Sequence, residues 1–394
     1  MSIIHFRRHQ NPVLFTAMKK GEITTLSIAD VSRGGAGVAK LATGLTVFVP
    51  YTMTSDVVRA RIIEHKKKFA TAQMIELVEA SPERVIPQCK FFGQCGGCQW
   101  QHIPYSMQWQ LKLKGIRQAL KSAKISSKVT IEEYPAKQIW NYRNRIQLRG
   151  YKDQLGYYAA RSHDIVAINQ CNIANEHIND VLEKIKQQAT LFNKPYKVEI
   201  EYLGDGKIQW TWNEQHAASG FRQINDEQNM KLKHWIEHTL QKNQFVLDLY
   251  GGSGNLCFGL AIKGYEVHCI DISAPATAPD NTPPSLTFHQ SDVLPWLKQR
   301  ITEIKFKRLP APANTWSAII DPPRGGLADQ FDDIVERLET LKVNDLVAVG
   351  CKTDSWTRDL SRFIQRGWKI HKLAAFDFFP HTMHVETVAQ LSRD

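Results

Sequence analysis

The sequence predicts an α/β protein that ends in a doubly wound, Rossmann-like domain and begins with a small β-barrel. In the last third of the chain, short apolar runs alternate with helical patterns, as in parallel sheets with crossover helices. Residues 22–80 instead hold several short strand patterns separated by turns, which is typical of a small barrel. A chain of 394 residues is too long for one ordinary core. We therefore expect three domains, at 15–80, 81–218 and 219–394.

Charge and hydropathy narrow the class of protein. The net charge is +11, and residues 1–100 hold 13 Lys and Arg against 7 Asp and Glu. This excess favours a polyanionic partner such as nucleic acid, although a solvated basic surface would also explain it. No apolar run approaches the roughly 20 residues of a membrane helix, and the first residues lack the apolar core of a signal peptide. We expect a cytoplasmic monomer with no membrane partner.

The N-terminal barrel is predicted to have a basic outer face. Strand patterns lie at 23–28, 45–49, 56–63 and 69–75. Basic residues alternate with apolar ones or fill a hairpin tip in this region, namely Arg59, Arg61, Lys66, Lys67 and Lys68. Small barrels of this kind commonly bind single-stranded or looped RNA. A purely structural barrel with a wet basic loop is the alternative.

Four cysteines form a candidate metal site. Cys89, Cys95 and Cys98 follow a C-x5-C-x2-C pattern with glycines between them, and Cys171 supplies a fourth thiol. Four thiolates can hold either zinc or an iron–sulfur cluster. A zinc ribbon usually has two C-x2-C pairs and this chain has one, which favours [4Fe–4S] over zinc. The alternative is a set of unligated cysteines, as we expect for Cys257 and Cys269 in apolar core patterns.

The middle region is predicted to be one helix followed by a mainly antiparallel sheet. The helix pattern covers 105–124, and the strand patterns cover 141–149, 154–158, 165–168, 197–202 and 207–212. The strands carry Arg143, Arg145 and Arg149 interleaved with tyrosine and tryptophan. That pattern suits contacts to an RNA backbone and stacking on bases, and ordinary sheet packing explains the aromatics equally well.

A glycine-rich turn at 250–255 organises the last domain. The apolar run 245–249 stops at Gly251, Gly252 and Gly254, and a helical pattern starts after Asn255. Glycines there allow close approach of the backbone to a ligand at a helix N-terminus. The next run, 267–270, ends at Asp271, and an acid at that position suits ribose hydroxyls. Because the phosphate-cradling G-x-G-x-x-G spacing is missing, the pattern favours S-adenosylmethionine over a dinucleotide.

The remaining strands of this domain end in further candidate site residues. Strand patterns follow at 317–320 and 346–349, with a closing antiparallel pair near 368–376 and 383–391, while 272–287 is rich in proline where a crossover helix would be expected. Asp321 follows the strand at 317–320 and precedes two prolines. Cys351 follows the strand at 346–349. A cysteine at a strand end is more often structural, but beside a cofactor pocket it becomes a candidate nucleophile.

The neighbours of Cys351 and Glu386 suggest their chemistry. A helix starting near Asp354, with Lys352 and Arg358 close by, predicts a favoured thiolate at Cys351. Glu386 interrupts an apolar strand pattern, and a buried carboxylate with a raised pKa suits a proton acceptor. His381 and His384 are candidates for RNA contacts or for orienting this loop, and each of these residues could also be an ordinary polar strand residue.

Taken together, these motifs resemble the RNA 5-methyluridine (uracil-C5) methyltransferase family, in its iron–sulfur-bearing ribosomal-RNA branch. The resemblance runs from residue 22 to near the end of the chain. Its motifs are the barrel, the four cysteines, Phe-x-Gln-x-Asn, the glycine turn, Asp-Pro-Pro-Arg-x-Gly, Cys-x7-Asp-Leu and Phe-Pro-x-Thr-x-His-Val-Glu. The chain departs from the family's Ser-Cys-Asn-Pro at residues 350–353, which read Gly-Cys-Lys-Thr.

The resemblance implies a TRAM domain, a [4Fe–4S] cluster and methylation of uracil C5 in RNA with S-adenosylmethionine. Cys351 would be the nucleophile and Glu386 the base. The implied cofactor contacts are Gln223, Tyr250, Asn255, Asp271, Asp292 and Asp321. Large-subunit (23S) ribosomal RNA is the expected substrate, with transfer RNA as the alternative. Two other interpretations are possible for this sequence. One is a non-catalytic RNA-binding or ribosome-assembly protein, and the other is an enzyme acting on another target such as cytosine C5.

Overall fold

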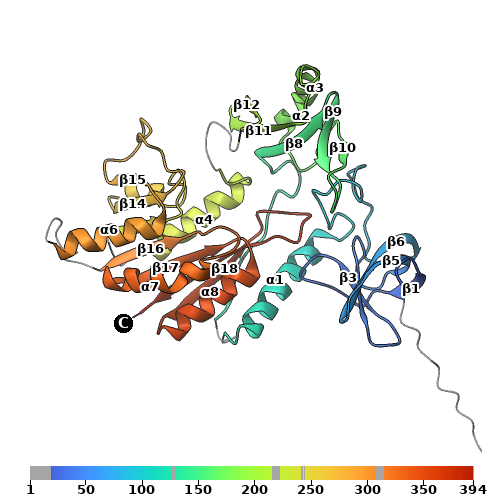
Figure 1. Cartoon of the computed structure of the whole chain (residues 1–394), viewed down its shortest axis with the longest axis horizontal. Coiled ribbons are helices and arrows are strands. Elements are labelled where there is room, and N and C mark those ends of the chain that lie inside the picture. The colour runs from blue at the N-terminus through green and yellow to red at the C-terminus, as the bar shows by residue number, and fades with distance from the viewer. Residues whose placement is uncertain are drawn as a thin grey trace, which may run out of the picture. The chain divides into compact units, whose positions relative to one another are not determined.

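The computed structural model describes residues 19–125, 129–214, 222–240, 243, 245–306 and 315–393. The chain divides into two compact units, Met1–Val85 and Ile86–Asp394 (Figure 1). The predicted boundary at 218/219 and Phe221 of the Phe-x-Gln-x-Asn motif lie outside the described residues. The three domain ranges therefore stay a prediction. None of the described helices is both long enough and apolar enough to span a membrane.

The first unit is a six-stranded sheet. Its strands are β1 (Ile23–Ser27), β2 (Asp30–Val31), β3 (Gly37–Lys40), β4 (Thr46–Val49), β5 (Val57–His65) and β6 (Phe69–Glu79). The order is β1-β5-β6-β4-β3-β2, antiparallel except for β4 and β6. The two edge strands β1 and β2 are nearly consecutive in the chain, so the sheet must curl back on itself as a barrel does. The five predicted basic residues are all exposed, since Arg59 and Arg61 alternate with buried residues of β5, and the three lysines at 66–68 form the tip between β5 and β6.

A five-stranded antiparallel sheet lies within the second unit. Its strands, in order, are β10 (Ile165–Ala167), β9 (Gln154–Tyr158), β8 (Arg145–Tyr151), β11 (Tyr196–Gly204) and β12 (Lys207–Trp212). Two helices, α2 (Glu176–Asp180) and α3 (Leu182–Ala189), contribute to its apolar core. The strand predicted from residue 141 begins at Arg145 instead. The reason is that the amides of Arg143 and Asn144 bond to Ile173 and Ile224, outside the sheet.

An eight-stranded sheet forms the rest of the second unit. Its order is β15 (Leu286–Gln290), β14 (Glu266–Asp271), β13 (Phe245–Leu249), β16 (Trp316–Ile320), β17 (Val343–Gly350), β19 (Glu386–Ser392), β18 (Lys369–Phe376) and β7 (Ile131–Tyr134). The first five strands are parallel, and β19 runs antiparallel to both of its neighbours. The doubly wound fold is thus confirmed. β15 was not predicted, and the segment 272–285 before it contains turns and no helix.

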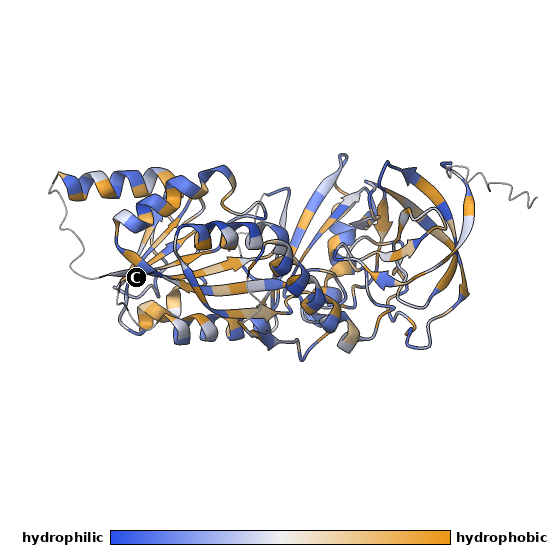
Figure 2. Cartoon of the chain, turned by 90° about the horizontal axis from the view of Figure 1, so that it is seen from below, coloured by the Kyte–Doolittle hydropathy of each residue, from blue (hydrophilic) through white to orange (hydrophobic). Residues whose placement is uncertain are grey.

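Helices cover both faces of this sheet. On one face lie α1 (Tyr105–Ser122), α6 (Val293–Lys305), α7 (Phe331–Thr340) and α8 (Thr353–Gln365), and on the other lie α4 (Asp226–Thr239) and α5 (Phe258–Ile262). Strand β13 illustrates why both faces need cover. Leu247 and Leu249 pack in the apolar core on the face of α1, and Val246 packs in the core on the opposite face. Figure 2 shows the resulting pattern, with apolar strands inside and mixed, amphipathic helices outside. All strand ends discussed below belong to this sheet.

Candidate active site

Five of the predicted catalytic and cofactor residues gather at one edge of the eight-stranded sheet. The parallel strands β14, β13, β16 and β17 are paired side by side, so their carboxyl ends meet at that edge. Asp271 ends β14, whereas Tyr250, Asp321 and Cys351 follow the ends of the other three strands. The antiparallel strand β19 starts at the same edge, where Thr387 pairs with Gly350. Glu386, one residue before Thr387, therefore comes beside Cys351.

The glycine-rich turn after β13 has the tight geometry that its sequence predicts. Tyr250 takes a left-handed backbone with φ 64°, and Gly252 and Gly254 also have positive φ. Gly251 packs so closely that a Cβ atom there would lie 2.6 Å from both Asp248 Oδ2 and Cys269 Sγ. No side chain fits at that position. The turn is fixed to the neighbouring strand, because the Tyr250 amide donates to the Ile270 carbonyl at 2.9 Å.

Three buried residues, Asp248, Cys257 and Cys269, contact this turn from the core. A carboxylate oxygen of Asp248 and the sulfurs of Cys257 and Cys269 lie within 4.8 Å of one another, and all three residues are buried. Burial raises the pKa of the Asp248 carboxyl to about 7. The Cys257 thiol donates to the Gly254 carbonyl at 3.5 Å. The two cysteines are core residues as predicted, and their thiols also donate hydrogen bonds to carbonyls of the turn.

Three of the predicted cofactor residues, Tyr250, Asp271 and Asp292, lie close enough together for their charges to interact. Asp271 Oδ1 accepts bonds from the amide and hydroxyl of Ser273, both at 2.6 Å. Asp292 is exposed at the N-terminus of α6. Burial, together with the carboxylates of Asp292 and Asp271, raises the pKa of Tyr250 to about 12. The Tyr250 hydroxyl is therefore a neutral hydrogen-bond donor beside two acids.

Two more of the six predicted cofactor residues, Asn255 and Gln223, lie toward α4. The Asn255 amide exchanges two hydrogen bonds of 2.9 Å with the Asn229 amide on that helix. Sequence reasoning missed this partner, which ties the turn to the helix behind it. Gln223 is 7% exposed and lies just before α4, where its carbonyl accepts a bond from Asn144.

Glu386, the candidate base, and Asp321, a predicted cofactor residue, lie close enough together for their charges to interact. Glu386 is 3% exposed, and burial raises its pKa well above the ordinary value. The charge of Asp321 raises the pKa of Glu386 further, and Arg324 opposes both effects. Burial also raises the pKa of Asp321 to about 7. The prediction of a buried carboxyl with a raised pKa at Glu386 is confirmed, although Glu386 begins strand β19 and does not interrupt it.

The prediction that the Cys351 thiolate is favoured is wrong. Burial, and then the charges of Glu386 and Asp321, raise the pKa of the Cys351 thiol to about 11. Arg358 does not relieve this, because its guanidinium is held by Asp359 at 2.8 and 2.9 Å. Arg324 is the cation that lowers the pKa of Cys351. Sequence reasoning gave Arg324 no role, although it stands in the Asp-Pro-Pro-Arg motif.

One of the departures around Cys351, the glycine at residue 350, has a structural explanation. Gly350 lies against the indole of Trp356, and a Cβ at residue 350 would come within 2.7 Å of the ring. The Trp356 ring nitrogen donates to the Ala348 carbonyl at 3.1 Å. A serine at residue 350 would collide with this ring. The tryptophan on α8 therefore requires glycine at residue 350.

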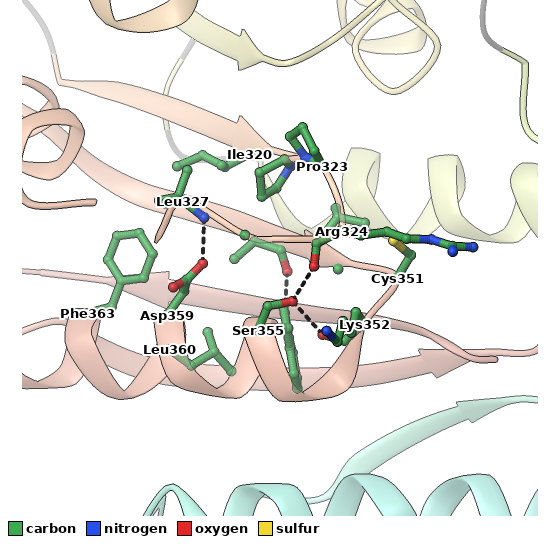
Figure 3. Close-up of a pocket in the computed structure, with 16 residues that line it drawn as sticks. Ile320, Pro323, Arg324, Leu327, Cys351, Lys352, Ser355, Asp359, Leu360 and Phe363 are labelled. Atoms are coloured by element: carbon green, nitrogen blue, oxygen red, sulfur yellow. Dashed lines mark hydrogen bonds between the residues drawn. The ribbon is translucent and has the colours of Figure 1, made fainter. Parts of the chain in front are cut away.

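Helix α8 also holds the turn that follows Asp321. Figure 3 shows the Ser355 hydroxyl donating to the carbonyls of Arg324 and Lys352, at 2.8 and 3.0 Å. In the same view the Arg324 side chain extends alongside Cys351, and both residues line one cavity. The segments that carry the candidate nucleophile Cys351 and Arg324 are therefore both held by the same helix.

The four cysteines of the predicted metal site line a single cavity. Burial raises the pKa of Cys95 to about 11 and that of Cys98 to about 12. Among the described residues, no three of the four sulfurs lie within 4.8 Å of one another. Tetrahedral zinc, with Zn–S bonds of about 2.3 Å, would need sulfurs roughly 3.8 Å apart. Soft sulfur ligands spread around a larger space fit a cluster better than a single ion.

Comparisons with known proteins agree with this architecture. Residues 18–75 match the TRAM domain model, and residues 298–394 match the model described as tRNA (uracil-5-)-methyltransferase. An uncharacterized RNA methyltransferase of Bdellovibrio bacteriovorus is 29% identical over 95% of this chain and 96% of its own length. The 23S rRNA (uracil(1939)-C(5))-methyltransferase RlmD of Histophilus somni is 26% identical over 94% of this chain and 96% of its own length.

A solved structure shows the same fold. The Pyrococcus abyssi tRNA (uracil-54, C5)-methyltransferase, in complex with S-adenosyl-L-homocysteine, aligns with a TM-score of 0.62 at 21% identity, covering 93% of this chain and 99% of that one. Fold and site thus define a methyltransferase with a Rossmann-like domain and an N-terminal TRAM domain. The chain is thus similar to TRAM domains over residues 18–75, to RNA uracil-C5 methyltransferases over residues 298–394, and to proteins named RNA methyltransferases over nearly its whole length.

Proposed function

We propose that this protein methylates C5 of uracil in RNA, with S-adenosylmethionine as methyl donor and Cys351 and Glu386 as catalytic residues. The observation that carries the proposal is the meeting of these two side chains at adjacent strand ends. Thr387 pairs with Gly350, and the Thr387 hydroxyl donates to the Gly350 carbonyl at 2.8 Å. Gln223, Tyr250, Asn255, Asp271, Asp292 and Asp321 are proposed to bind the donor at the neighbouring strand ends.

The chemistry follows from the weak nucleophilicity of uracil C5. Addition of the Cys351 sulfur to C6 creates an enolate, whose C5 can attack the methyl group of a sulfonium. C5 then carries both a hydrogen and a methyl group. Glu386 removes that proton, the C6–S bond breaks, and the C5–C6 double bond and the thiolate are restored. The uridine must leave its stack to enter this site.

The electrostatics of the site suit this order of events. With a pKa of about 11, the Cys351 thiol must lose its proton as the C6–S bond forms, and Asp321 and Glu386 are the nearby carboxyls. Arg324 offsets their negative charge. The rate of addition at C6 should therefore rise with pH between about 6 and 9, because more of the Cys351 thiol is ionised.

RNA is the proposed partner, and large-subunit ribosomal RNA the proposed target. The exposed basic residues of β5 and of the tip before β6 offer a phosphate-binding face. Relatives named as 23S rRNA methyltransferases align over nearly the whole chain. Transfer RNA is the second candidate, since the matched family model and the similar solved structure both bear that name. We propose that the enzyme acts as a monomer in the cytoplasm.

We further propose that Cys89, Cys95, Cys98 and Cys171 hold a [4Fe–4S] cluster. Such a cluster would supply thiolate cross-links between the turn at 89–98 and the segment at Cys171, and methyl transfer needs no electron from it. Anaerobically purified protein should contain about four irons and four sulfides per chain. One zinc without sulfide would mean that the metal is zinc, and folded protein without metal would remove the site.

Covalent trapping tests the catalytic proposal. RNA with 5-fluorouridine at the target should form a denaturation-resistant complex with the wild-type protein and the methyl donor, because a base cannot remove fluorine. Cys351→Ala should form none. RNA with 5-fluorocytidine is the matched control, and trapping only there would transfer the assignment to cytosine. A trapped complex with Cys351→Ala would overturn the role of Cys351.

The target RNA is tested separately. Ribosomal and transfer RNA from a strain that lacks the protein can be digested and analysed by mass spectrometry. Loss of 5-methyluridine from the large-subunit RNA alone is the expected result. Loss from transfer RNA would favour the second candidate, and no loss from either RNA would support a non-catalytic RNA-binding protein.

A further inference from the structure

The loop that leads into Glu386 is held largely by a distant part of the chain. This loop, residues 377–385, connects β18 to β19 and is called the base loop below. Several of its hydrogen bonds come from helix α1, more than 260 residues earlier in the chain. The polar residues of α1 involved are Tyr105, Gln108 and Lys112. They are spaced three and four residues apart and so share one face of the helix.

Gln108 is the centre of these contacts. Its side chain is completely buried. Its amide oxygen accepts a bond from the His381 backbone N–H at 2.8 Å. Its amide nitrogen lies 3.2 Å from His381 Nδ1 and donates to the carbonyls of Trp100 and Ile103 at 3.0 and 2.8 Å. One side chain therefore joins the base loop to the segment that follows the cysteine turn.

The two flanking residues fix the start of the base loop. Lys112 and Asp377 form a fully buried ion pair of 2.7 Å, and the Lys112 ammonium also donates to the Phe379 carbonyl at 2.9 Å. The Tyr105 hydroxyl donates to the other Asp377 oxygen at 3.0 Å. Removing either member of a buried ion pair leaves an uncompensated charge, so this contact resists any displacement of the loop.

The middle of the base loop bonds directly to the cysteine turn. The backbone amides of Gln99 and Trp100, one and two residues after Cys98, both donate to the His381 carbonyl at 3.0 Å. The His381 ring stacks on Trp140 with ring centres 3.9 Å apart. His381 has φ 66°, a conformation that a non-glycine residue keeps only where surrounding contacts impose it.

We propose that Gln108 is a positioning residue for the proposed methyl-transfer reaction, and that through His381 it holds the base loop so that Glu386 faces Cys351. The inference rests on the proposed function for its catalytic consequence. Gln108 itself is too deeply enclosed to touch RNA or the methyl donor, and it acts through the loop. A displacement of about 1 Å at a catalytic group can cost on the order of 100-fold in rate.

The test compares two glutamines of the same helix. Gln108→Met keeps the length of the side chain and removes its hydrogen bonds, whereas Gln110→Met changes an exposed residue of α1. Gln108→Met should lower the maximal rate of methylation about 100-fold and leave the affinities for methyl donor and RNA within about threefold of wild type. Gln110→Met should behave as wild type in every measurement.

Hydrogen exchange provides a readout that does not depend on activity. In Gln108→Met the amides of His381, Gln99 and Trp100 should exchange faster, while amides of the parallel strands β13 and β16 keep their protection. Unchanged exchange at those three amides would overturn the proposal that Gln108 holds the base loop. Normal turnover despite faster exchange would overturn its role in positioning Glu386. If wild-type protein methylates no RNA, the proposed function fails, and the exchange result still decides whether Gln108 holds the loop.

Discussion

The two halves of the eight-stranded sheet build their parts of the site in different ways. In the parallel half, the cofactor turn is shaped by nearby residues: Tyr250 bonds to Ile270, and Gly251 packs on Asp248. In the antiparallel half, Glu386 depends on a loop whose contacts come from α1 and from the cysteine turn. The proposed donor turn is thus shaped mainly by residues of one strand–turn–helix unit and the strand beside it, whereas the proposed proton acceptor depends on long-range packing.

This difference suggests how the two halves respond to damage. A local turn can lose one contact and keep its shape, because backbone sterics at the glycines still favour it. The base loop is fixed by a buried ion pair and by one glutamine, both remote in the chain. Changes far from the chemistry should therefore affect the maximal rate more than donor affinity.

The largest expected effect comes from the catalytic half. Glu386→Gln removes the proton acceptor and leaves Cys351 in place. We expect turnover to fall by about 100- to 10,000-fold, the range for loss of a general base. Addition at C6 and methyl transfer should still occur, so covalent protein–RNA adduct should accumulate with ordinary uridine RNA. Gel electrophoresis under denaturing conditions measures the adduct.

Two outcomes would contradict this role for Glu386. Turnover of Glu386→Gln near the wild-type rate would mean that another group removes the C5 proton. Loss of turnover without adduct would place Glu386 before methyl transfer. The double variant Glu386→Gln/Cys351→Ala is the matched control and should form no adduct.

The sequence was informative wherever the site depends on local geometry. The glycine turn, the acids at strand ends and the C-x5-C-x2-C turn could be predicted because each is defined within a few residues. The protonation state of Cys351 could not. Nearby positive charges suggested a thiolate, but Arg358 bonds to Asp359, and two carboxyls from other strands raise the pKa of Cys351. A pattern along the chain does not reveal which charges meet in space.

The same limit explains the residues that sequence reasoning missed. Gln108 and Asn229 are polar residues within helical patterns, where a solvent-facing side chain is the ordinary expectation. Their partners, His381 and Asn255, lie 273 and 26 residues away. The Gly350 departure likewise makes sense only once Trp356 is seen to fill the space that a side chain would need.

A smaller effect is expected in the cofactor half. Asp271→Asn keeps an oxygen that can accept bonds from the Ser273 amide and hydroxyl, but it removes the charge proposed to bind ribose hydroxyls. We expect the affinity for S-adenosylmethionine to fall about 10- to 100-fold, with the maximal rate at saturating donor nearly unchanged. Isothermal titration calorimetry and initial rates measure the two quantities. A lower maximal rate with normal donor affinity would contradict the conclusion that the cofactor half affects donor affinity more than the rate.

The last prediction concerns the residues packed under the cofactor turn, and it affects stability and leaves activity aside. Burial raises the pKa of Asp248 to about 7, against an ordinary value of 3.8. Between about pH 4 and pH 7 the folded protein keeps a proton that the unfolded chain has lost. The free energy of unfolding therefore decreases as pH rises through that range, by at most about 4 kcal/mol from this group. Asp321 and Glu386 act in the same direction.

Asp248→Asn removes this contribution without adding a charge. In the absence of methyl donor, its thermal unfolding temperature should decrease less between pH 5 and pH 8 than that of the wild type. Asp292→Asn, at an exposed position, is the matched control and should follow the wild type. Calorimetry at several pH values measures the difference. If Asp248→Asn and the wild type lose the same stability over this range, Asp248 is ionised in the folded protein, and the turn rests on a charged carboxylate.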